Sequence, residues 1–511
     1  MLVCYYNFYF REAINLILLI SLTEIDIYAA LKKYFGFTKF KGLQEEVVRS
    51  VLDKKDAFVI MPTGGGKSLC YQLPAFIEEG TAIVVSPLIA LMKNQVDALR
   101  ALSSETGIAH VLNSSLNKTE VKQVKSDITS GITKLLYVAP ESLTKDENVE
   151  FLQSVKISFV AIDEAHCISE WGHDFRPEYR NLKKIIERIR DNIPIVGLTA
   201  TATPKVQEDI LKNLGIQDAN TFKASFNRPN LYYEVRPKTK NIDADVIRFV
   251  KQHEGKSGII YCLSRKRVEE LSQALQVNGI KAVPYHAGLD SKTRVRHQDM
   301  FLMEDIDVVV ATIAFGMGID KSNVRWVIHT NLPKNLEGYY QEIGRAGRDG
   351  LNAETLLFYS MRDVVLYRQF ALDSANSEMQ IDKLERMLQF AQAKSCRRKI
   401  LLSYFGEFLP QDCGNCDACS NPPQNFDATL LAQKALSAVA RVKESESLVM
   451  AVNVLRGSQN AKLYDKQYHL LKTYGIGKEL SFNDWSDYFV QLTNVGALEI
   501  AYNESSALKI T

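Results

Sequence analysis

The sequence has almost no excess charge of either sign, because 62 lysine and arginine residues face 60 aspartate and glutamate residues over 511 positions. A net charge of +2 excludes a polybasic, histone-like protein, although a groove needs only local positive charge to hold nucleic acid. Hydrophobic residues are 46% and charged residues 24% of the chain, which excludes disorder or low complexity for its bulk. At roughly 100–200 residues per domain, we expect about three or four domains.

Long hydrophobic runs are also scarce. Residues 1–22 form the most apolar stretch, but Arg11 and Glu12 interrupt it. The uninterrupted part is about ten residues, whereas a membrane-spanning helix needs ~20. A signal peptide would have positive charge before its apolar run and a small-residue cleavage site, and neither pattern is clean here. We therefore expect residues 1–23 to be an extension that catalysis does not need, with a membrane or partner contact as the alternative.

The eight cysteines do not form the pattern of a disulfide framework. Four are scattered singly beside apolar runs or motifs, namely Cys4, Cys70, Cys167 and Cys262. This usage favours a reducing compartment, so we expect a cytoplasmic protein. The other four follow the spacing C-x16-C-x2-C-x2-C, at Cys396, Cys413, Cys416 and Cys419. Four closely spaced thiolates favour a tetrahedral zinc site, and the alternative, a redox C-x-x-C, lacks the βαβ context it would need.

Two sets of short apolar runs alternate with longer amphipathic stretches. The first set is AFVIM (57–61), AIVVSP (82–87), LLYVAP (135–140), FVAID (159–163) and IVGLTAT (195–201). The second is GIIYC (258–262), AVPYH (282–286), VVVAT (308–312), WVIHT (326–330) and TLLFY (355–359). Such runs are typical of buried parallel strands with helices on both faces. We expect two doubly wound α/β domains, at 24–226 and 227–364, then a helical module at 365–425 and a last domain at 426–511 that ends in two short strands.

The segment MPTGGGKS (61–68) follows a predicted strand and opens a helical stretch, which is the context of a phosphate-binding loop. In such a loop, backbone N–H groups close on phosphate oxygens, Lys67 reaches the β and γ phosphates, and the Ser68 hydroxyl ligates Mg²⁺. The candidate nucleotide ligands are Thr63, Gly64, Gly65, Gly66, Lys67 and Ser68. The alternative is a glycine-rich turn with a chance Lys-Ser pair.

Two further motifs fit ATP hydrolysis. DEAH (163–166) ends a predicted strand, where Asp163 can hold Mg²⁺ through water and Glu164 can orient or deprotonate the attacking water. QEIGRAGRDG (341–350) brings Arg345 and Arg348 from the second α/β domain, and either can stabilise charge on the transferred phosphoryl group. A solvated acidic loop and surface arginines on a turn are the alternatives.

These motifs, with SPLIALMKNQV (86–96), TAT (199–201) and ATIAFGMGID (311–320), resemble the superfamily 2 helicases. CISEWGHDFRPEY (167–179), YHAGL (285–289) and GYYQEIGRAGRDG (338–350) narrow the resemblance to the RecQ family of DNA helicases, from about residue 24 onward. The resemblance implies two tandem RecA-like domains, a helical zinc-binding module and a winged-helix domain. It also implies ATP-dependent 3′ to 5′ unwinding of DNA in recombination, repair and fork restart, with ATP, Mg²⁺ and Zn²⁺.

The segment 167–179 matches the aromatic-rich loop of that family. Trp171 and Phe175 offer faces on which unpaired bases can stack, and Arg176 can meet phosphates or bases. We include His173 among the candidate DNA contacts. Because the loop follows Glu164 directly, strand binding could be transmitted to the hydrolytic site; the alternative is an ordinary aromatic core cluster.

The segment FGFTKFKGLQ (35–44) matches the part of the family that recognises adenine. The resemblance implies that Gln44 reads the adenine edge by paired hydrogen bonds. Phe37 and Lys41 stand where the family usually has a tyrosine and an arginine. Because an ammonium cannot stack flat as a guanidinium does, we expect a weaker nucleotide contact here.

At the C-terminal end, the resemblance implies a winged helix that grips duplex DNA, with Asn503, Glu504 and Ser505 near the tip of a short hairpin. We expect the family's additional helical domain, HRDC, to be absent. The implied partners are single- and double-stranded DNA and, among proteins, single-stranded-DNA-binding protein and other repair proteins, for a monomer at the bacterial nucleoid without a membrane contact. The rival functions are an RNA helicase and a DNA-binding regulator with a vestigial nucleotide site.

Overall fold

We analysed a computed structural model of the chain. It describes residues 26–103, 105–113, 116–316, 321–372, 376–422, 426–501 and 507–511. The expectations for residues 1–23 and for the hairpin tip at Asn503, Glu504 and Ser505 concern residues outside these ranges. The chain divides into two compact units, the first ending at Phe226 and the second beginning at Asn227. Within the described ranges, no helix combines the length and apolarity needed to cross a membrane.

The first unit is built on a seven-stranded parallel sheet in the order β3-β4-β2-β5-β6-β1-β7. Its strands are β1 (Ala57–Ile60), β2 (Thr81–Val85), β3 (Ala109–Leu112), β4 (Leu135–Val138), β5 (Ile157–Ile162), β6 (Ile195–Thr199) and β7 (Asn220–Lys223). Its α-helices are α2 (Ile27–Phe35), α3 (Gln44–Leu52), α4 (Leu69–Ile77), α5 (Ile89–Leu102), α6 (Lys118–Thr129), α7 (Pro140–Leu143), α8 (Asp146–Gln153), α9 (Leu182–Ile189) and α10 (Pro204–Leu214). All five expected strands are present, and β3 and β7 were missed because they are short edge strands without an apolar run.

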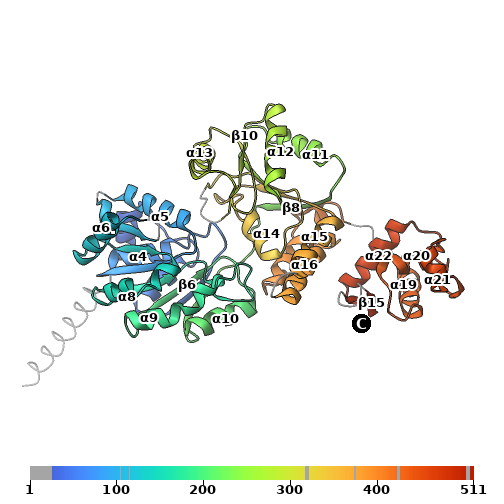
Figure 1. The fold of residues 1–511 in the computed structure, drawn as a ribbon, viewed down its shortest axis with the longest axis horizontal. Coiled ribbons are helices and arrows are strands. Elements are labelled where there is room, and N and C mark those ends of the chain that lie inside the picture. Colours follow the sequence, from blue (N-terminus) through green and yellow to red (C-terminus); the bar gives the residue numbers. More distant parts are fainter. Residues whose placement is uncertain are drawn as a thin grey trace, which may run out of the picture. The chain divides into compact units, whose positions relative to one another are not determined.

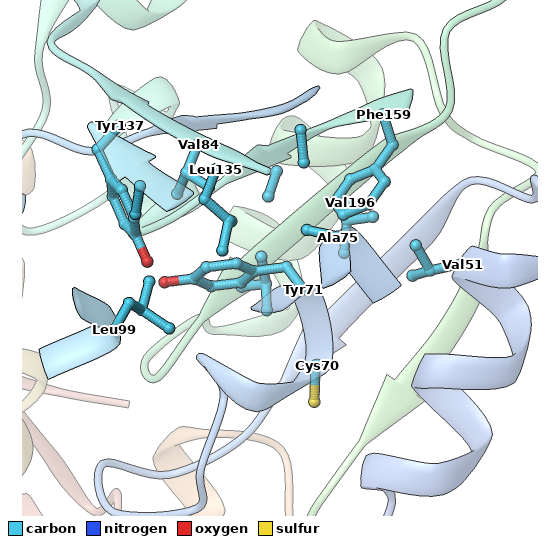
Figure 2. Close-up of a cluster of buried hydrophobic side chains, with 14 of the residues drawn as sticks. Val51, Cys70, Tyr71, Ala75, Val84, Leu99, Leu135, Tyr137, Phe159 and Val196 are labelled. Atoms are coloured by element: carbon cyan, nitrogen blue, oxygen red, sulfur yellow. The ribbon is translucent and has the colours of Figure 1, made fainter. Parts of the chain in front are cut away.

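The core of this unit fills the space between the sheet and helices α3, α4 and α5. Figure 2 shows Val84, Leu135, Phe159 and Val196 from the strands facing side chains of these helices. The Tyr71 and Tyr137 rings, 6.4 Å apart, turn their hydroxyl groups toward each other (Figure 2). A buried hydroxyl needs a hydrogen-bond partner, and Gln72 Nε2 donates to the Tyr137 hydroxyl at 3.1 Å. This packing fixes α4, and therefore the loop that precedes it.

The second unit begins with a six-stranded parallel sheet in the order β10-β11-β9-β12-β13-β8. Its strands are β8 (Leu231–Pro237), β9 (Gly258–Tyr261), β10 (Ala282–Tyr285), β11 (Val308–Ala311), β12 (Trp326–His329) and β13 (Ala353–Tyr359). Its helices are α11 (Ile242–Gln252), α12 (Arg265–Val277), α13 (Ser291–Leu302) and α14 (Leu336–Ile343). A Cβ atom on Gly258 would overlap the Trp326 indole, so the close approach of β9 and β12 requires glycine there. The strand β8 was missed because it is a half-exposed edge strand that carries charged residues.

Helices follow the second sheet, as expected. They are α15 (Met361–Leu372), α16 (Ser377–Gln392), α17 (Arg397–Tyr404) and α18 (Asp417–Ser420), and α15 and α16 pack side by side (Figure 1). The last part contains α19 (Thr429–Arg441), α20 (Leu448–Arg456), α21 (Ala461–Asp465), α22 (Phe482–Asn494) and the antiparallel pair β14 (Leu498–Ala501) and β15 (Ala507–Ile510). Helices α19, α20 and α22 enclose a core around Trp485 and Phe489. The α/β fold class and the expected helical and winged-helix parts are confirmed.

Candidate functional site

The phosphate-loop motif forms the turn between β1 and α4. Gly64 and Gly66 have φ angles of 82° and 77°, a left-handed backbone that side chains other than glycine rarely adopt. The Lys67 ammonium folds back over the turn and donates to the Met61 carbonyl at 3.0 Å. This compact, glycine-dependent turn at a helix N-terminus is the geometry that binds phosphate in other proteins.

The DEAH motif lies at the same edge of the sheet as this loop. The Met61 amide donates to the Thr199 carbonyl at 3.1 Å, and the Asp163 amide donates to the Val85 carbonyl at 2.9 Å. The carboxyl ends of β1, β6, β2 and β5 therefore meet, as parallel strands require. Burial and the neighbouring Glu164 carboxylate raise the pKa of Asp163 to about 7, while Lys67 opposes this shift. A nearby cation would stabilise the ionised form of this buried carboxyl group, and carboxylate oxygens are ligands of Mg²⁺. The chemistry of Asp163 therefore suits Mg²⁺.

Glu164 is held in a strained and specific orientation. Its φ angle is 50° and its ψ angle 46°, a left-handed conformation that costs about 1–3 kcal/mol for a residue other than glycine. Its Oε2 lies 3.3 Å from His166 Nδ1, and the same nitrogen lies 3.1 Å from Thr199 Oγ1. His166 and Thr199 belong to the DEAH and TAT motifs, but the motifs alone do not reveal this contact. His166 therefore contacts both the Glu164 carboxylate and the Thr199 hydroxyl.

The aromatic-rich loop contacts the DEAH motif through a pair of histidines. The rings of His166 and His173 stack with their centroids 4.3 Å apart. Trp171 is 41% exposed, and Lys205 Nζ lies 3.0 Å from the centroid of its ring. Trp171 is therefore an aromatic surface of this loop that solvent, or a base, can reach.

The other two candidate DNA contacts of the loop lie partly buried. Arg176 donates to the Pro87 carbonyl at 2.9 Å and forms an ion pair with Asp174 at 3.2 Å. The Arg180 guanidinium lies 5.6 Å from the centre of the Phe175 ring. In this conformation Arg176 therefore anchors the loop to the segment before α5.

The predicted adenine segment is tied to the phosphate loop. Gln44 is buried, its Nε2 donates to the Gly66 carbonyl at 3.1 Å, and its Oε1 accepts from the Lys41 amide at 2.8 Å. Phe37 is 56% exposed. The oxygen and the nitrogen of the Gln44 side-chain amide are thus both bonded to main-chain atoms in this conformation. Gln44 would have to break these hydrogen bonds to pair with an adenine edge.

The two candidate arginines of the second unit differ sharply in environment. Arg345 is buried, with 4% of its surface exposed, and lies near Tyr261, whose hydroxyl donates to the Phe315 carbonyl at 2.8 Å. The Tyr261 ring stacks on His329, whose Nε2 lies 2.7 Å from Glu342 Oε2. Arg348 leaves the same turn but is partly exposed. Arg348 is therefore the arginine of this pair that an outside ligand could reach.

The four cysteines of the second cluster are brought together. One sulfur atom from each of Cys396, Cys413, Cys416 and Cys419 lies within 4.8 Å of the others, and the Cys413 and Cys419 sulfurs are 3.8 Å apart. Tetrahedral zinc with Zn–S bonds near 2.3 Å would set neighbouring sulfurs ~3.8 Å apart. Burial opposes ionisation of Cys413, but the Asn415 amide and the Arg398 side chain lower its pKa to about 7. The donor set fits zinc.

Comparison with known proteins agrees with this geometry. The DEAD/DEAH box helicase model matches residues 41–210, the helicase conserved C-terminal domain 241–350, the RecQ zinc-binding model 361–420 and the RQC domain 422–511. A solved structure of the Mycobacterium smegmatis helicase Lhr, bound to ssDNA and AMP-PNP, matches with a TM-score of 0.53 at 20% identity, covering 84% of this chain and 57% of that chain. That likeness supports the fold alone.

Two curated relatives carry the family assignment. The chain is 45% identical to the ATP-dependent DNA helicase RecQ of Haemophilus influenzae, over 93% of this chain and 77% of that protein. It is 43% identical to the ATP-dependent DNA helicase RecQ of Bacillus subtilis, over 90% of this chain and 78% of that protein. With the zinc-binding and RQC matches, these identities show that the chain belongs to the RecQ family of ATP-dependent DNA helicases.

Proposed function

We propose that this RecQ-family enzyme hydrolyses ATP to move 3′ to 5′ along one DNA strand, unwinding duplex DNA in recombination, repair and fork restart. The observation that carries the proposal is a continuous path of contacts inside the first unit. Glu164 faces His166 at 3.3 Å, and His166 stacks on His173 of the aromatic-rich loop. A loop that meets a DNA strand is thus two side chains away from the carboxylate proposed to orient water.

In the proposed nucleotide site, the backbone N–H groups of residues 63–66 and the Lys67 ammonium hold the phosphates. To do so, Lys67 must break its hydrogen bond to the Met61 carbonyl. A charged phosphate oxygen then replaces a neutral acceptor, and the new hydrogen bond is stronger. Mg²⁺ bound by Ser68 and Asp163 would neutralise phosphate charge and align the γ-phosphoryl group. Glu164 orients the attacking water and accepts its proton.

The second unit contributes the arginines. We assign Arg348 to the charge that develops on the transferred phosphoryl group, because it is the more exposed of the two. Arg345, which is buried near Tyr261, keeps the turn in shape. Phe37, Lys41 and Gln44 are assigned to the adenine end of the nucleotide.

In the proposed DNA site, Trp171 and Phe175 stack on bases of the tracked strand. His173 transmits the position of the loop to His166, and Arg176 anchors the loop and meets the strand only when its bonds to Asp174 and Pro87 open. Loss of a loop contact should therefore weaken the coupling between strand binding and hydrolysis strongly. It should weaken the affinity for DNA less.

We assign the domains as 24–226 and 227–364 for the two RecA-like parts, 365–425 for the zinc module and 426–511 for the winged helix that holds the duplex. Residues 1–23 are assigned no catalytic role. From the family we further propose a monomer that works in the cytoplasm on nucleoid DNA, with single-stranded-DNA-binding protein as a partner.

The test is ATP hydrolysis by the purified chain with single-stranded DNA, with RNA of the same sequence, and without nucleic acid. The proposal predicts strong stimulation by DNA and weak stimulation by RNA. Stronger stimulation by RNA would favour an RNA helicase, and hydrolysis that is absent under all three conditions would favour a regulator with a vestigial site.

A further inference from the structure

A short segment at the start of the second unit, residues 227–231, is bound on one side by the zinc module. Arg398 of α17 donates to the Leu231 carbonyl at 2.7 Å, to Asn227 Oδ1 at 2.9 Å and to the Arg228 carbonyl. Asn415 Nδ2 donates to the Pro229 carbonyl at 3.0 Å and to the Leu231 carbonyl at 3.3 Å. Two side chains of the zinc module thus hold the main chain of this segment.

The same segment binds the arginine-bearing turn on its other side. The Arg228 guanidinium donates to the Ala346 carbonyl at 2.9 Å and to the Gly347 carbonyl at 2.8 Å. Asn230 Nδ2 donates to the Gly347 carbonyl and to the Leu351 carbonyl, both at 2.9 Å. The three carbonyl acceptors of these four hydrogen bonds lie on either side of Arg348 in the sequence, so the segment determines where the backbone of Arg348 is held.

Residues 227–231 and the turn that carries Arg348 are closely packed. Gly347 has a φ angle of 58°, and a Cβ atom on it would overlap the Asn230 amide. Interiors packed this closely transmit a displacement instead of absorbing it. A shift of Asn230 or Arg228 therefore moves the backbone next to Arg348.

Asn415 and Arg398, which bind residues 227–231 from the zinc module, are close in sequence to the candidate metal ligands. Asn415 lies between Cys413 and Cys416 in the sequence, and its backbone amide donates to Cys413 Sγ at 3.4 Å. Arg398 stands two positions after Cys396 in the sequence. A metal that fixes the four sulfurs therefore also fixes the positions from which Asn415 and Arg398 reach the segment.

We infer that the zinc module is a positioning element of the ATPase, acting through Asn415, Arg398, Arg228 and Asn230 on the turn that carries Arg348. The inference rests on the proposed function, because it takes Arg348 to stabilise the transferred phosphoryl group. Asn415 and Arg228 touch no reacting atom in this account. They are positioning residues, and their loss slows the chemical step without weakening ATP binding.

The test variant is Asn415→Ala, which removes both bonds to the segment and keeps all four thiols. Because a misplacement of about 1 Å can cost ~100-fold in rate, we expect DNA-stimulated kcat to fall about tenfold. The KM for ATP should stay within about twofold, since ground-state binding is unchanged. Zinc content, measured by metal analysis, should stay at about one equivalent per chain. The matched control is Asn421→Ala, an exposed asparagine of the same module, which should keep wild-type kcat.

The variant Arg228→Lys tests the same inference from outside the zinc module, should Asn415→Ala fold poorly. It keeps the charge but loses the planar fork that reaches two carbonyls, so kcat should fall while zinc content and KM stay unchanged. Either variant with wild-type kcat and intact zinc would overturn the inference.

A double-variant cycle separates this inference from the proposed function. If Asn415 acts through Arg348, Asn415→Ala should slow single-turnover hydrolysis far less in an Arg348→Ala background than in the wild type. An undiminished effect in that background would overturn the inference and leave the proposed function intact. Normal turnover of Arg348→Ala alone would contradict the role proposed for Arg348, and the inference would fall with it.

Discussion

The imidazole rings of His166 and His173 stack nearly in parallel, with their centroids 4.3 Å apart and their planes 17° from each other. His166 belongs to the DEAH motif and also faces Glu164, whereas His173 belongs to the aromatic-rich loop. Because His166 contacts both His173 and Glu164, a movement of the loop changes the surroundings of Glu164. Under the proposed function, this contact is the route by which DNA binding at the loop reaches Glu164.

Substitution of Trp171 by alanine should uncouple hydrolysis from DNA. Stacking on a base contributes about 1–3 kcal/mol, so overall DNA affinity should fall modestly because other contacts remain. Stimulation of the ATPase by single strands should fall much further. Fluorescence anisotropy and steady-state hydrolysis measure the two effects, and Phe408→Ala, which removes an aromatic ring that is 86% exposed, is the control. Equal losses in affinity and stimulation would reduce Trp171 to an ordinary contact.

Lys67→Ala and Glu164→Gln should both abolish unwinding, for different reasons. The first removes the ammonium from the phosphate site, so ATP binding should weaken. The second keeps the shape of the side chain but removes the base, so ATP should bind normally and hydrolysis should stall. Binding of a fluorescent ATP analogue distinguishes the two, and weak binding by Glu164→Gln would contradict this assignment.

Arg345 and Arg348 should separate into a structural and a catalytic arginine. Arg345→Ala removes a long side chain that is buried near Tyr261, which should destabilise the fold by about 0.5–3 kcal/mol. Arg348→Ala should leave the melting temperature unchanged, bind ATP and lose most turnover. Thermal unfolding and kcat measured on both variants test this, and near-normal turnover of a well-folded Arg348→Ala would make Arg345 the next candidate.

Cys416→Ser should release zinc and destabilise the helical module. The apparent binding energy of structural zinc is about 10–16 kcal/mol in small domains, so loss of a ligand should lower protease resistance and DNA binding together. ATP binding at Lys67 should suffer less, because Lys67 lies in the other unit. Cys262→Ser, a buried cysteine outside the cluster, is the control and should retain zinc. A native wild-type protein with less than half an equivalent of zinc and four reactive thiols would rule out the site.

Much of the fold follows from local sequence. Buried strands such as β1, β5 and β9 are continuous apolar runs. The glycine-rich loop can be identified from its position between a predicted strand and a predicted helix. The edge strands β3, β7 and β8 were missed because one side of each lacks a partner strand, so they need no continuous apolar run. The four cysteines were found from spacing alone.

The contacts that organise the site could not be predicted in this way. Asn415 and Pro229 are 186 positions apart, and Arg228 and Ala346 are 118 apart, so no periodicity or spacing connects them. The different burial of Arg345 and Arg348 depends on where the turn lies against Tyr261. The inward bonds of Gln44 and Arg176 depend equally on tertiary packing.

The central claim is that ATP hydrolysis drives movement along a DNA strand in one direction. It is tested most directly by strand separation of fluorescently labelled duplexes that carry a 3′ or a 5′ single-stranded tail, with Glu164→Gln as the inactive control. The account predicts that the wild-type chain with ATP and Mg²⁺ separates the 3′-tailed duplex, that it leaves the 5′-tailed duplex paired, and that Glu164→Gln separates neither. Separation of the 5′-tailed duplex in preference, or separation by Glu164→Gln at the wild-type rate, would contradict it.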